Sequence, residues 1–214
     1  MSSTDLLLPP ALRGSLHRWA APIAVALTVL LAVRAETGGA RATVIIYGVC
    51  VSAMLTVSAT YHARRLFDRP RRVLRRCDHA AIFLAIAGTY TAVTVLALDG
   101  ATRVVLLALA WLIAGFGVAI RMMWFDSHPA LTAAVYLVAG WMILLDLPAY
   151  LAALSGSELA LLAVGGGLYT LGAVVFALKW PDPWSHIFGY HEVFHAFVIA
   201  AALTQWFVVF SLAG

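Results

Sequence analysis

Two histidines stand four positions apart in the stretch FGYHEVFHAF, at His191 and His195. On a helix this spacing places both imidazoles on one face, where a single metal ion can bind to both. The stretch also reads H-E-x-x-H, with Glu192 after the first histidine, which is a signature of zinc proteases. The chemistry of this stretch therefore depends on which other residues lie at the level of the two histidines.

The elements that carry these residues are predicted to span a membrane. Of the 214 residues, 63% are hydrophobic and 11% are charged, whereas soluble domains carry about 25% charged residues. A membrane-spanning helix needs about 20 apolar residues. Seven such stretches occur, near residues 16–34, 42–63, 77–98, 102–123, 130–153, 158–179 and 188–212. We therefore expect an all-α, multi-pass protein of the cell membrane, with a disordered tail over residues 1–15 and a seven-helix bundle over residues 16–214.

Basic residues are distributed unevenly between the two sides of this bundle. One side carries 11 of the 14 Arg and Lys residues, and the other carries only Arg34, Arg41 and Arg103. Cytoplasmic loops are enriched in Arg and Lys, so we expect the N-terminus in the cytoplasm and the C-terminus outside. The run RRLFDRPRRVLRR, residues 64–76, is interpreted as a topology anchor that contacts anionic lipid headgroups rather than nucleic acid.

The alternation of the spans brings five polar residues to one level. The second span ends with SATYH, which places Ser58 and His62 on one face near the cytoplasmic boundary. The third span begins there with Asp78, and the last span begins there with His191 and His195. Ionisable residues inside a membrane are costly and usually functional. We therefore expect these five residues to form one site.

Three histidines beside a carboxylate favour a zinc site. Catalytic zinc keeps three protein ligands and one open position, and the predicted ligands are His62, His191 and His195. Asp78 is expected to hold or deprotonate a zinc-bound water, whose pKa falls to about 7 in such sites. Ser58 is expected to hydrogen-bond the water or a substrate carbonyl. The alternative is that these residues only form hydrogen bonds between helices.

Other polar residues have more ordinary expectations. His17 is expected to cap or anchor the first helix at the interface, and His79 to contact lipid headgroups or a neighbouring helix. Tyr90 and Thr91 lie about three turns deeper than Asp78 and are candidates for lining a cavity above the metal.

A protease hypothesis is weaker than the H-E-x-x-H match suggests. Intramembrane zinc proteases take a third ligand from an L-D-G motif, and L-D-G occurs here at residues 98–100. Asp99 is expected at the outer end of its span, about 30 Å from His191. It also precedes the histidines in the chain, whereas the protease order is the reverse. The H-E-x-x-H match is therefore interpreted as incidental.

Four segments carry a resemblance to a known family. They are RGSLHRWAAP (13–22), SATYH (58–62), DHAAIFLAIAGTYT (78–91) and FGYHEVFHAFVIAA (188–201). In order and spacing they resemble the bacterial hemolysin III family, the prokaryotic branch of the progestin and adipoQ receptor (PAQR) group, which includes the adiponectin receptors. The resemblance covers essentially the whole chain and implies a seven-helix bundle with a cytoplasmic N-terminus.

The resemblance also implies roles for the five residues. It implies zinc held by His62, His191 and His195, with Asp78 at the zinc-bound water and with Ser58 matching the family serine. Relatives include ceramide-cleaving enzymes, so the group is viewed as membrane metal-dependent hydrolases. One departure is Ala92, where relatives commonly have proline; its absence predicts a straighter third helix.

Three functions are the leading hypotheses, and a transporter is a further alternative, although the sequence has no pair of broken helices in matching halves. The first is a zinc-dependent hydrolase of lipid-like amides or esters, similar to a ceramidase. The second is a receptor-like or membrane-homeostasis protein with structural zinc, and the third is a pore-forming cytolysin of the hemolysin III type. The strongly apolar helices have no polar stripe to line a wide channel, which argues against the third. The expected partners are membrane lipids and a lipid-like substrate, without nucleic acid.

Overall fold

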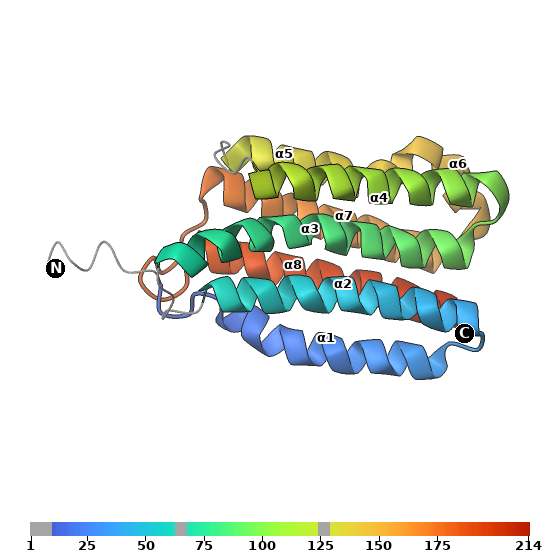
Figure 1. Cartoon of the computed structure of the whole chain (residues 1–214), viewed down its shortest axis with the longest axis horizontal. Coiled ribbons are helices and arrows are strands. Elements are labelled where there is room, and N and C mark those ends of the chain that lie inside the picture. The colour runs from blue at the N-terminus through green and yellow to red at the C-terminus, as the bar shows by residue number, and fades with distance from the viewer. Residues whose placement is uncertain (1–9, 63–67, 124–128) are drawn as a thin grey trace, which may run out of the picture.

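A computed structural model describes residues 10–62, 68–123 and 129–214 (Figure 1). These residues form helices, and they contain no β-sheet beyond an isolated bridge between Trp184 and Phe188. The elements are α1 (Ser15–Arg34), α2 (Gly38–His62), α3 (Asp68–Ala97), α4 (Gly100–Met123), α5 (Pro129–Gly140), the 3₁₀ helix η2 (Met142–Asp146), α6 (Leu147–Ala153), α7 (Gly156–Leu178) and α8 (Tyr190–Leu212). The first nine residues of the predicted tail, and Arg64 and Arg65, lie outside the described residues.

Seven helical segments of the described chain are long and apolar enough to cross a membrane. Six are single helices, and the fifth, Leu131–Ala153, combines α5, η2 and α6. Each has 20 to 27 residues, which suffices to span the hydrocarbon core of a bilayer. The predicted all-α fold with seven membrane spans is confirmed, and the protein is a multi-pass membrane protein.

Helix α3 lies at the centre of the bundle. It packs against α2, α4, α5 and α8, while α8 also packs against α1 and α7. In its apolar stretch 61% of the residues are buried, against 17% in α1 and in α7. Figure 1 shows α2, α3 and α8 running side by side, with the beginning of α8 close to the end of α2. This arrangement positions the candidate site between the central helices.

Helix α3 is continuous from Asp68 to Ala97. Ala92, at the position where relatives commonly have proline, is fully buried within it. An alanine keeps its backbone N–H for the helix and has no ring to clash with the preceding turn. Helix α3 is therefore unbroken at this position, and the straightness of the third span stays a prediction.

The fifth span is interrupted, although the sequence predicted one helix over residues 130–153. Its middle is the 3₁₀ helix η2, after which α6 begins at Leu147. The Asp146 side chain caps α6 by accepting a hydrogen bond from the Ala149 N–H, and Pro148 occupies its first turn. Proline is tolerated in a first turn but not in a helix interior. The preceding helical segment therefore ends before Pro148, and α6 begins with Pro148 in its first turn.

A tyrosine of α3 satisfies the backbone at this interruption. The Tyr90 hydroxyl donates to the Gly140 carbonyl at 2.7 Å and accepts from the Ile143 N–H at 2.8 Å. Both backbone groups have left the regular helical ladder, and inside a membrane such groups need an internal partner. Tyr90 therefore supports the fifth span, and nearby Thr91 bonds to the Ala87 carbonyl and to the Trp111 indole.

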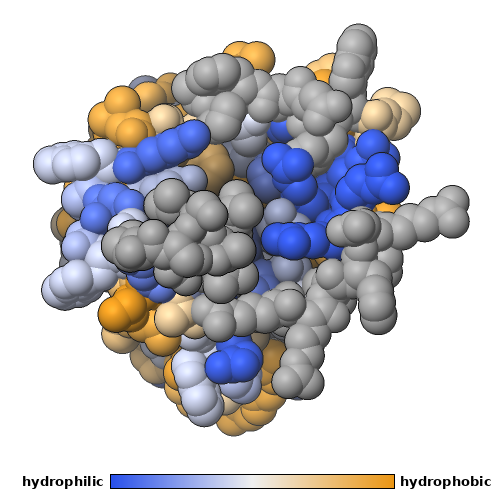
Figure 2. Space-filling view, turned by 90° about the vertical axis from the view of Figure 1, so that its left-hand side faces the viewer, coloured by the Kyte–Doolittle hydropathy of each residue, from blue (hydrophilic) through white to orange (hydrophobic). Residues whose placement is uncertain are grey.

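Hydrophilic side chains gather at one end of the bundle, as Figure 2 shows for the end where α2 finishes and α8 begins. The beginnings of α1 and α3 and the ends of α4 and α7 meet at this end, and they carry most of the described arginines and Lys179, while Arg34, Arg41 and Arg103 lie at the other end. Below it is called the arginine-rich end. The cytoplasmic location of this end remains a prediction from its charge.

Candidate metal centre

Three histidines meet at the arginine-rich end. His62 is the last residue of α2, and His191 and His195 lie one turn apart in the first turns of α8. One ring nitrogen of each lies within 4.8 Å of the others. The Nε2 atoms of His62 and His191 are 3.1 Å apart. These three residues could hold a metal ion. The topology of the spans alone had predicted the same group.

The donor set fits a transition metal. Zinc binds imidazole nitrogen at about 2.0–2.1 Å with tetrahedral geometry, so two ligand nitrogens lie about 3.3 Å apart. The 3.1 Å separation of the His62 and His191 nitrogens is close to that value. Imidazole ligands suit zinc, copper, iron and nickel rather than calcium or magnesium. The three rings also stand at 64–69° to one another, so no two of them are stacked face to face.

The predicted Asp78 and Ser58 lie beside this group. Asp78, in α3, places Oδ2 3.9 Å from the His62 Nε2 and 3.8 Å from the His79 Nδ1. Ser58, one turn before His62, is buried, and its side chain interacts with the Asp78 carboxylate. The structure therefore brings all five predicted residues to one place, and their individual roles remain predictions.

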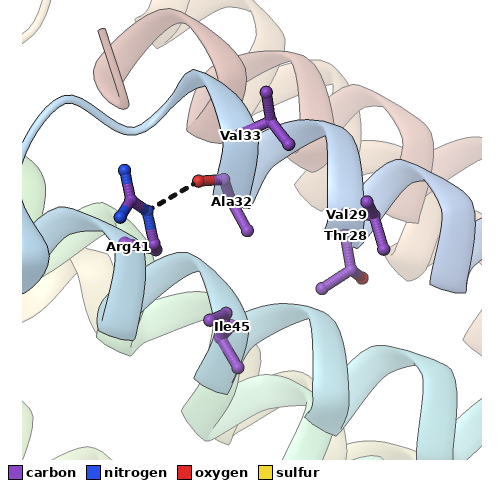
Figure 3. A pocket seen from close by; sticks show the side chains of 6 residues that line it. All are labelled: Thr28, Val29, Ala32, Val33, Arg41 and Ile45. Atoms are coloured by element: carbon purple, nitrogen blue, oxygen red, sulfur yellow. Dashed lines mark hydrogen bonds between the residues drawn. The ribbon is translucent and has the colours of Figure 1, made fainter.

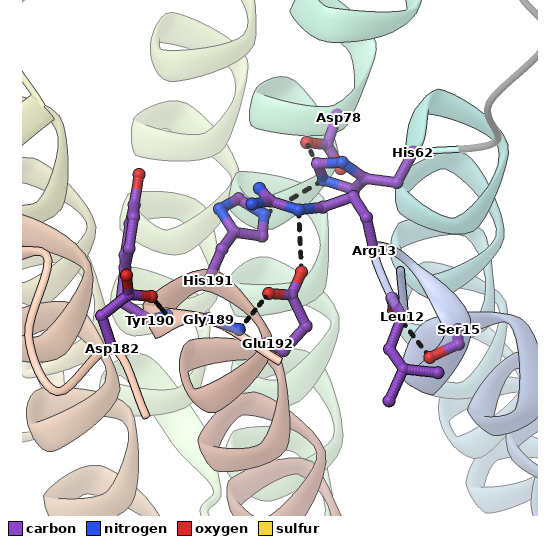
Figure 4. Close-up of polar contacts among 10 residues, drawn as sticks. All are labelled: Leu12, Arg13, Ser15, His62, Asp78, Asp182, Gly189, Tyr190, His191 and Glu192. Carbon is purple, nitrogen blue, oxygen red and sulfur yellow. Dashed lines mark hydrogen bonds and ion pairs between the residues drawn. The ribbon is translucent and has the colours of Figure 1, made fainter. Parts of the chain in front are cut away.

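The carboxylate of Glu192, in the H-E-x-x-H stretch, interacts with residues outside the histidine group. Its Oε1 forms an ion pair with the Arg13 Nε at 2.7 Å, and its Oε2 accepts from the Gly189 N–H at 2.9 Å (Figure 4). The residue is fully buried. One carboxylate oxygen thus neutralises an arginine and the other caps the start of α8. Both oxygens of Glu192 are therefore engaged, and the residue is not free to act as the general base that this motif supplies in zinc proteases.

The L-D-G motif also lies away from the histidines. Asp99 follows the end of α3, while Asp78 lies near its beginning. A separation of 21 residues along a helix corresponds to about 30 Å. The Asp99 side chain is 93% exposed and pairs with Arg103 at 2.7 Å. The geometric argument against a protease site therefore agrees with the structure.

Residues Pro10 to Gly14, which the sequence assigned to a tail, form a turn against the loop before α8. The Ala11 N–H donates to the His186 carbonyl at 2.8 Å, and the Leu12 N–H donates to the Ile187 carbonyl at 3.0 Å. Arg13 then reaches Glu192. Gly14 has a φ of +75° and initiates α1 next to His62. This N-terminal strap, Pro10–His17, lies directly over the histidine group.

His17 is a component of the site that the sequence did not assign to it. Its ring stacks on the His195 ring, with centroids 3.8 Å apart and planes 11° apart. It is buried, and neither of its ring nitrogens has a hydrogen-bond partner among the described residues. The sequence did contain one signal for this role, because His17 stands in the first turn of a span that begins on the same side of the membrane as the predicted metal site. The helix rotation that turns it toward His195 is not readable from one sequence.

A second polar cluster supports the beginning of α3. The Tyr136 hydroxyl, from α5, donates to the His79 carbonyl at 2.8 Å. The Arg121 guanidinium lies over the Tyr136 ring and donates to Thr132 at 3.0 Å. The His79 Nδ1 lies 3.0 Å from the Arg75 carbonyl oxygen. These bonds fix the turn of α3 that carries Asp78.

A shallow groove lies between α1 and α2, toward the opposite end of the bundle (Figure 3). Its lining is largely apolar, and Arg41 at its edge donates to the backbone carbonyls of Ala32 and Ala35. This groove lacks the histidines and carboxylates of the metal centre. The remaining lining residues are Thr28, Val29, Val33 and Ile45.

Comparison with known proteins agrees with this architecture. Residues 7–206 match the profile of a family described as Haemolysin-III related. A protein of Bacillus subtilis (strain 168) named "Hemolysin-3 homolog" is 31% identical over 164 residues, which cover 77% of this chain and 74% of the relative. "Hemolysin-3" of Bacillus cereus is 26% identical over 196 residues, covering 90% of this chain and 86% of the relative. The chain therefore belongs to the Haemolysin-III related family.

Proposed function

We propose that the protein is a zinc-dependent hydrolase of lipid-like amides or esters. The observation that carries this proposal is a group of three imidazole nitrogens within 4.8 Å of one another, next to the Asp78 carboxylate at 3.9 Å from His62. Three protein ligands with an open position are typical of catalytic zinc. Bound there, zinc would polarise a carbonyl and activate a water molecule at neutral pH.

The residues around the metal ligands have separate roles in this proposal. Asp78 accepts a proton at Oδ2, the oxygen that faces the His62 ring. The role assigned to Ser58, whose side chain interacts with the Asp78 carboxylate, is to orient that carboxylate by donating its hydroxyl hydrogen to it. A general base held in place by a second residue contributes about 10²–10⁴-fold to such reactions. Ser58 is thus a positioning residue for Asp78.

The depth of the site supports a lipid-like substrate. His62 ends one membrane span, and His191 lies at the beginning of another. A carbonyl at this depth is the one that joins a lipid headgroup region to its acyl chain. The resemblance to a group with ceramide-cleaving members points to the same class of bond. In this proposal a lipid amide or ester reaches the site without leaving the bilayer.

A receptor-like protein with structural zinc is the second candidate. Asp78 lies close enough to His62 to become a fourth ligand after a small movement. Four protein ligands would close the site, which is the arrangement of structural zinc. The hydrolase ranks first because the three histidines already supply the three ligands of catalytic zinc, while Asp78 lies 3.9 Å from His62.

A cytolysin ranks third. The relative from Bacillus cereus carries the name Hemolysin-3. Among the buried polar groups of the described spans, the Thr94 and Tyr150 hydroxyls bond to each other at 2.8 Å. The outward-facing side chains are mostly large and apolar, such as Leu112 and Phe116 of α4.

Turnover by purified protein tests the proposal. Protein in detergent is loaded with zinc and incubated with a fluorescent N-acyl sphingosine and, separately, with a long-chain fatty acyl ester. We expect zinc-dependent release of fatty acid by the wild type and none by His191→Ala. Zinc-loaded wild type that cleaves neither probe, or a His191→Ala variant that cleaves them equally fast, would contradict the hydrolase proposal.

A further inference from the structure

We propose that the N-terminal strap, Pro10–His17, is a built part of the metal centre, in which Arg13 and His17 are positioning residues for the two ligands of α8. The inference rests on the metal site of the proposed function. It assigns roles in positioning the metal ligands to Arg13, His17 and Glu192, none of which is itself a predicted ligand. The strap makes three separate contacts. Two are with the predicted ligands His195 and His62, and one is with Glu192, which follows the third predicted ligand, His191.

The first contact passes through Glu192. This residue lies between His191 and His195 in the sequence and is fully buried. Its Oε1 pairs with the Arg13 Nε at 2.7 Å, and only 18% of the Arg13 side chain is exposed. Its Oε2 holds the Gly189 N–H at the start of α8. A buried carboxylate needs a partner for its charge, so Arg13 fixes the first turn of α8 in relation to α1 (Figure 4).

The second contact is the stack of His17 on His195. The ring centroids are 3.8 Å apart and the planes are nearly parallel. The coordinating group within 4.8 Å contains His62, His191 and His195 but not His17. His17 therefore meets the site with the face of its ring. Such a contact restricts the rotation of the His195 ring and so sets the direction of its nitrogen atoms.

The third contact is between Gly14 and His62. A Cβ atom at Gly14 would lie 2.5 Å from the His62 Cβ, so the strap backbone packs directly on this ligand. Two backbone hydrogen bonds, from Ala11 and Leu12 to the loop before α8, hold the strap in place. One short segment thus contacts the end of α2 and the beginning of α8 together.

These contacts prepare the ligands for metal binding. Groups outside the ligand set that orient the ligands commonly contribute about 10–100-fold to metal affinity. Loss of the Arg13–Glu192 pair frees the first turn of α8, while loss of the His17 ring frees the His195 ring. We therefore expect both changes to weaken zinc binding although every ligand is still present.

Zinc affinity of the full chain tests the inference. Purified protein competes for zinc with a fluorescent chelator, and the melting temperature of the metal-free protein is measured in parallel. We expect Arg13→Gln and Glu192→Gln each to lower zinc affinity about 10–100-fold. The double variant should lose no more zinc affinity than the single variant with the larger loss, because both substitutions break the same ion pair. Arg13→Lys keeps the cation and should stay closer to the wild type.

Two substitutions of His17 distinguish a role of its aromatic ring from a role of its ring nitrogens. His17→Phe keeps an aromatic face against His195 and should bind zinc with nearly wild-type affinity, whereas His17→Ala should bind it about 10-fold more weakly. Arg103→Gln is the matched control, because Arg103 also pairs with a carboxylate, but near the opposite end of the bundle. Its zinc affinity should equal that of the wild type.

The outcomes are distinguishable. Unchanged zinc affinity in Arg13→Gln and His17→Ala, even with a lower melting temperature, would overturn the inference, since the strap would then serve stability alone. Equal losses in His17→Phe and His17→Ala would overturn the stacking role. Wild-type protein that binds no zinc would overturn the metal centre and this inference together. Zinc binding without turnover would overturn only the hydrolase.

Discussion

The Nε2 atoms of His62 and His191 lie 3.1 Å apart, although 129 positions separate the two residues in the chain. His62 ends α2 and His191 lies at the beginning of α8, so two spans meet at one depth. Two imidazoles at this separation either share one proton in a hydrogen bond or bind one metal ion. The third histidine and the neighbouring carboxylate favour the metal ion.

Removal of the metal ion should destabilise the protein. A ligand present at 100 times its Kd stabilises the folded state by about 2.7 kcal/mol, which corresponds to about 5–10 °C in Tm for a chain of this size. We expect a chelator to lower the Tm of zinc-loaded wild-type protein by this amount. The Tm of His191→Ala should not respond to the chelator, and an equal response in both proteins would count against the site.

Asp78→Asn should separate the enzyme from the structural-zinc protein. The amide cannot accept the proton that the carboxylate accepts, so turnover should fall about 10²–10⁴-fold, while zinc content stays at the wild-type level. Asp99→Asn, on an exposed side chain near the far end of α3, is the matched control. Loss of zinc from Asp78→Asn would instead identify Asp78 as a ligand and favour the structural role.

Gly14→Ala should disturb the metal site more than a comparable glycine elsewhere. Gly14 has a φ of +75° and its new Cβ would meet His62 at 2.5 Å, whereas Gly100 has a φ of +63° and open space around it. Both substitutions carry about 1–2 kcal/mol of backbone strain. We expect both to lower the Tm and only Gly14→Ala to lower zinc occupancy. Equal zinc occupancy in the two variants would show that the contact with His62 is unimportant.

Tyr90→Phe should weaken the interrupted fifth span. The variant removes the partner of the Gly140 carbonyl and the Ile143 N–H. Each buried group left unsatisfied costs about 1–3 kcal/mol, so the Tm should fall clearly. Tyr169→Phe is the control, because the Tyr169 hydroxyl makes no hydrogen bond to another described residue. A Tyr90→Phe variant as stable as this control would refute the supporting role of Tyr90.

The number of spans and the composition of the histidine group were predictable from the sequence. Spans are long apolar runs, and their alternation fixes which ends share one side of the membrane. Spacings of four residues, as between Ser58 and His62 or between His191 and His195, fix which side chains share a helix face. Together these two rules brought the five residues to one level without knowledge of the tertiary packing.

The strap and the interruption were not predicted. The Arg13–Glu192 pair depends on how the segment before α1 folds back over α8, and the His17 stack depends on the rotation of α1 about its axis. Neither is encoded in hydrophobic periodicity. The break in the fifth span did have local signals, since Asp146 and Pro148 form a helix start within an apolar run. The Tyr90 hydroxyl that completes it comes from another helix.

Metal content per chain tests the central claim most directly. Elemental mass spectrometry is applied to wild-type protein, His191→Ala and the control His186→Ala, which alters an exposed histidine of the loop before α8. All three are purified in detergent after exposure to zinc. The account predicts about one zinc per chain in the wild type and in His186→Ala, and almost none in His191→Ala. Wild-type protein that stays free of metal, or a His191→Ala variant with as much zinc as the wild type, would contradict it.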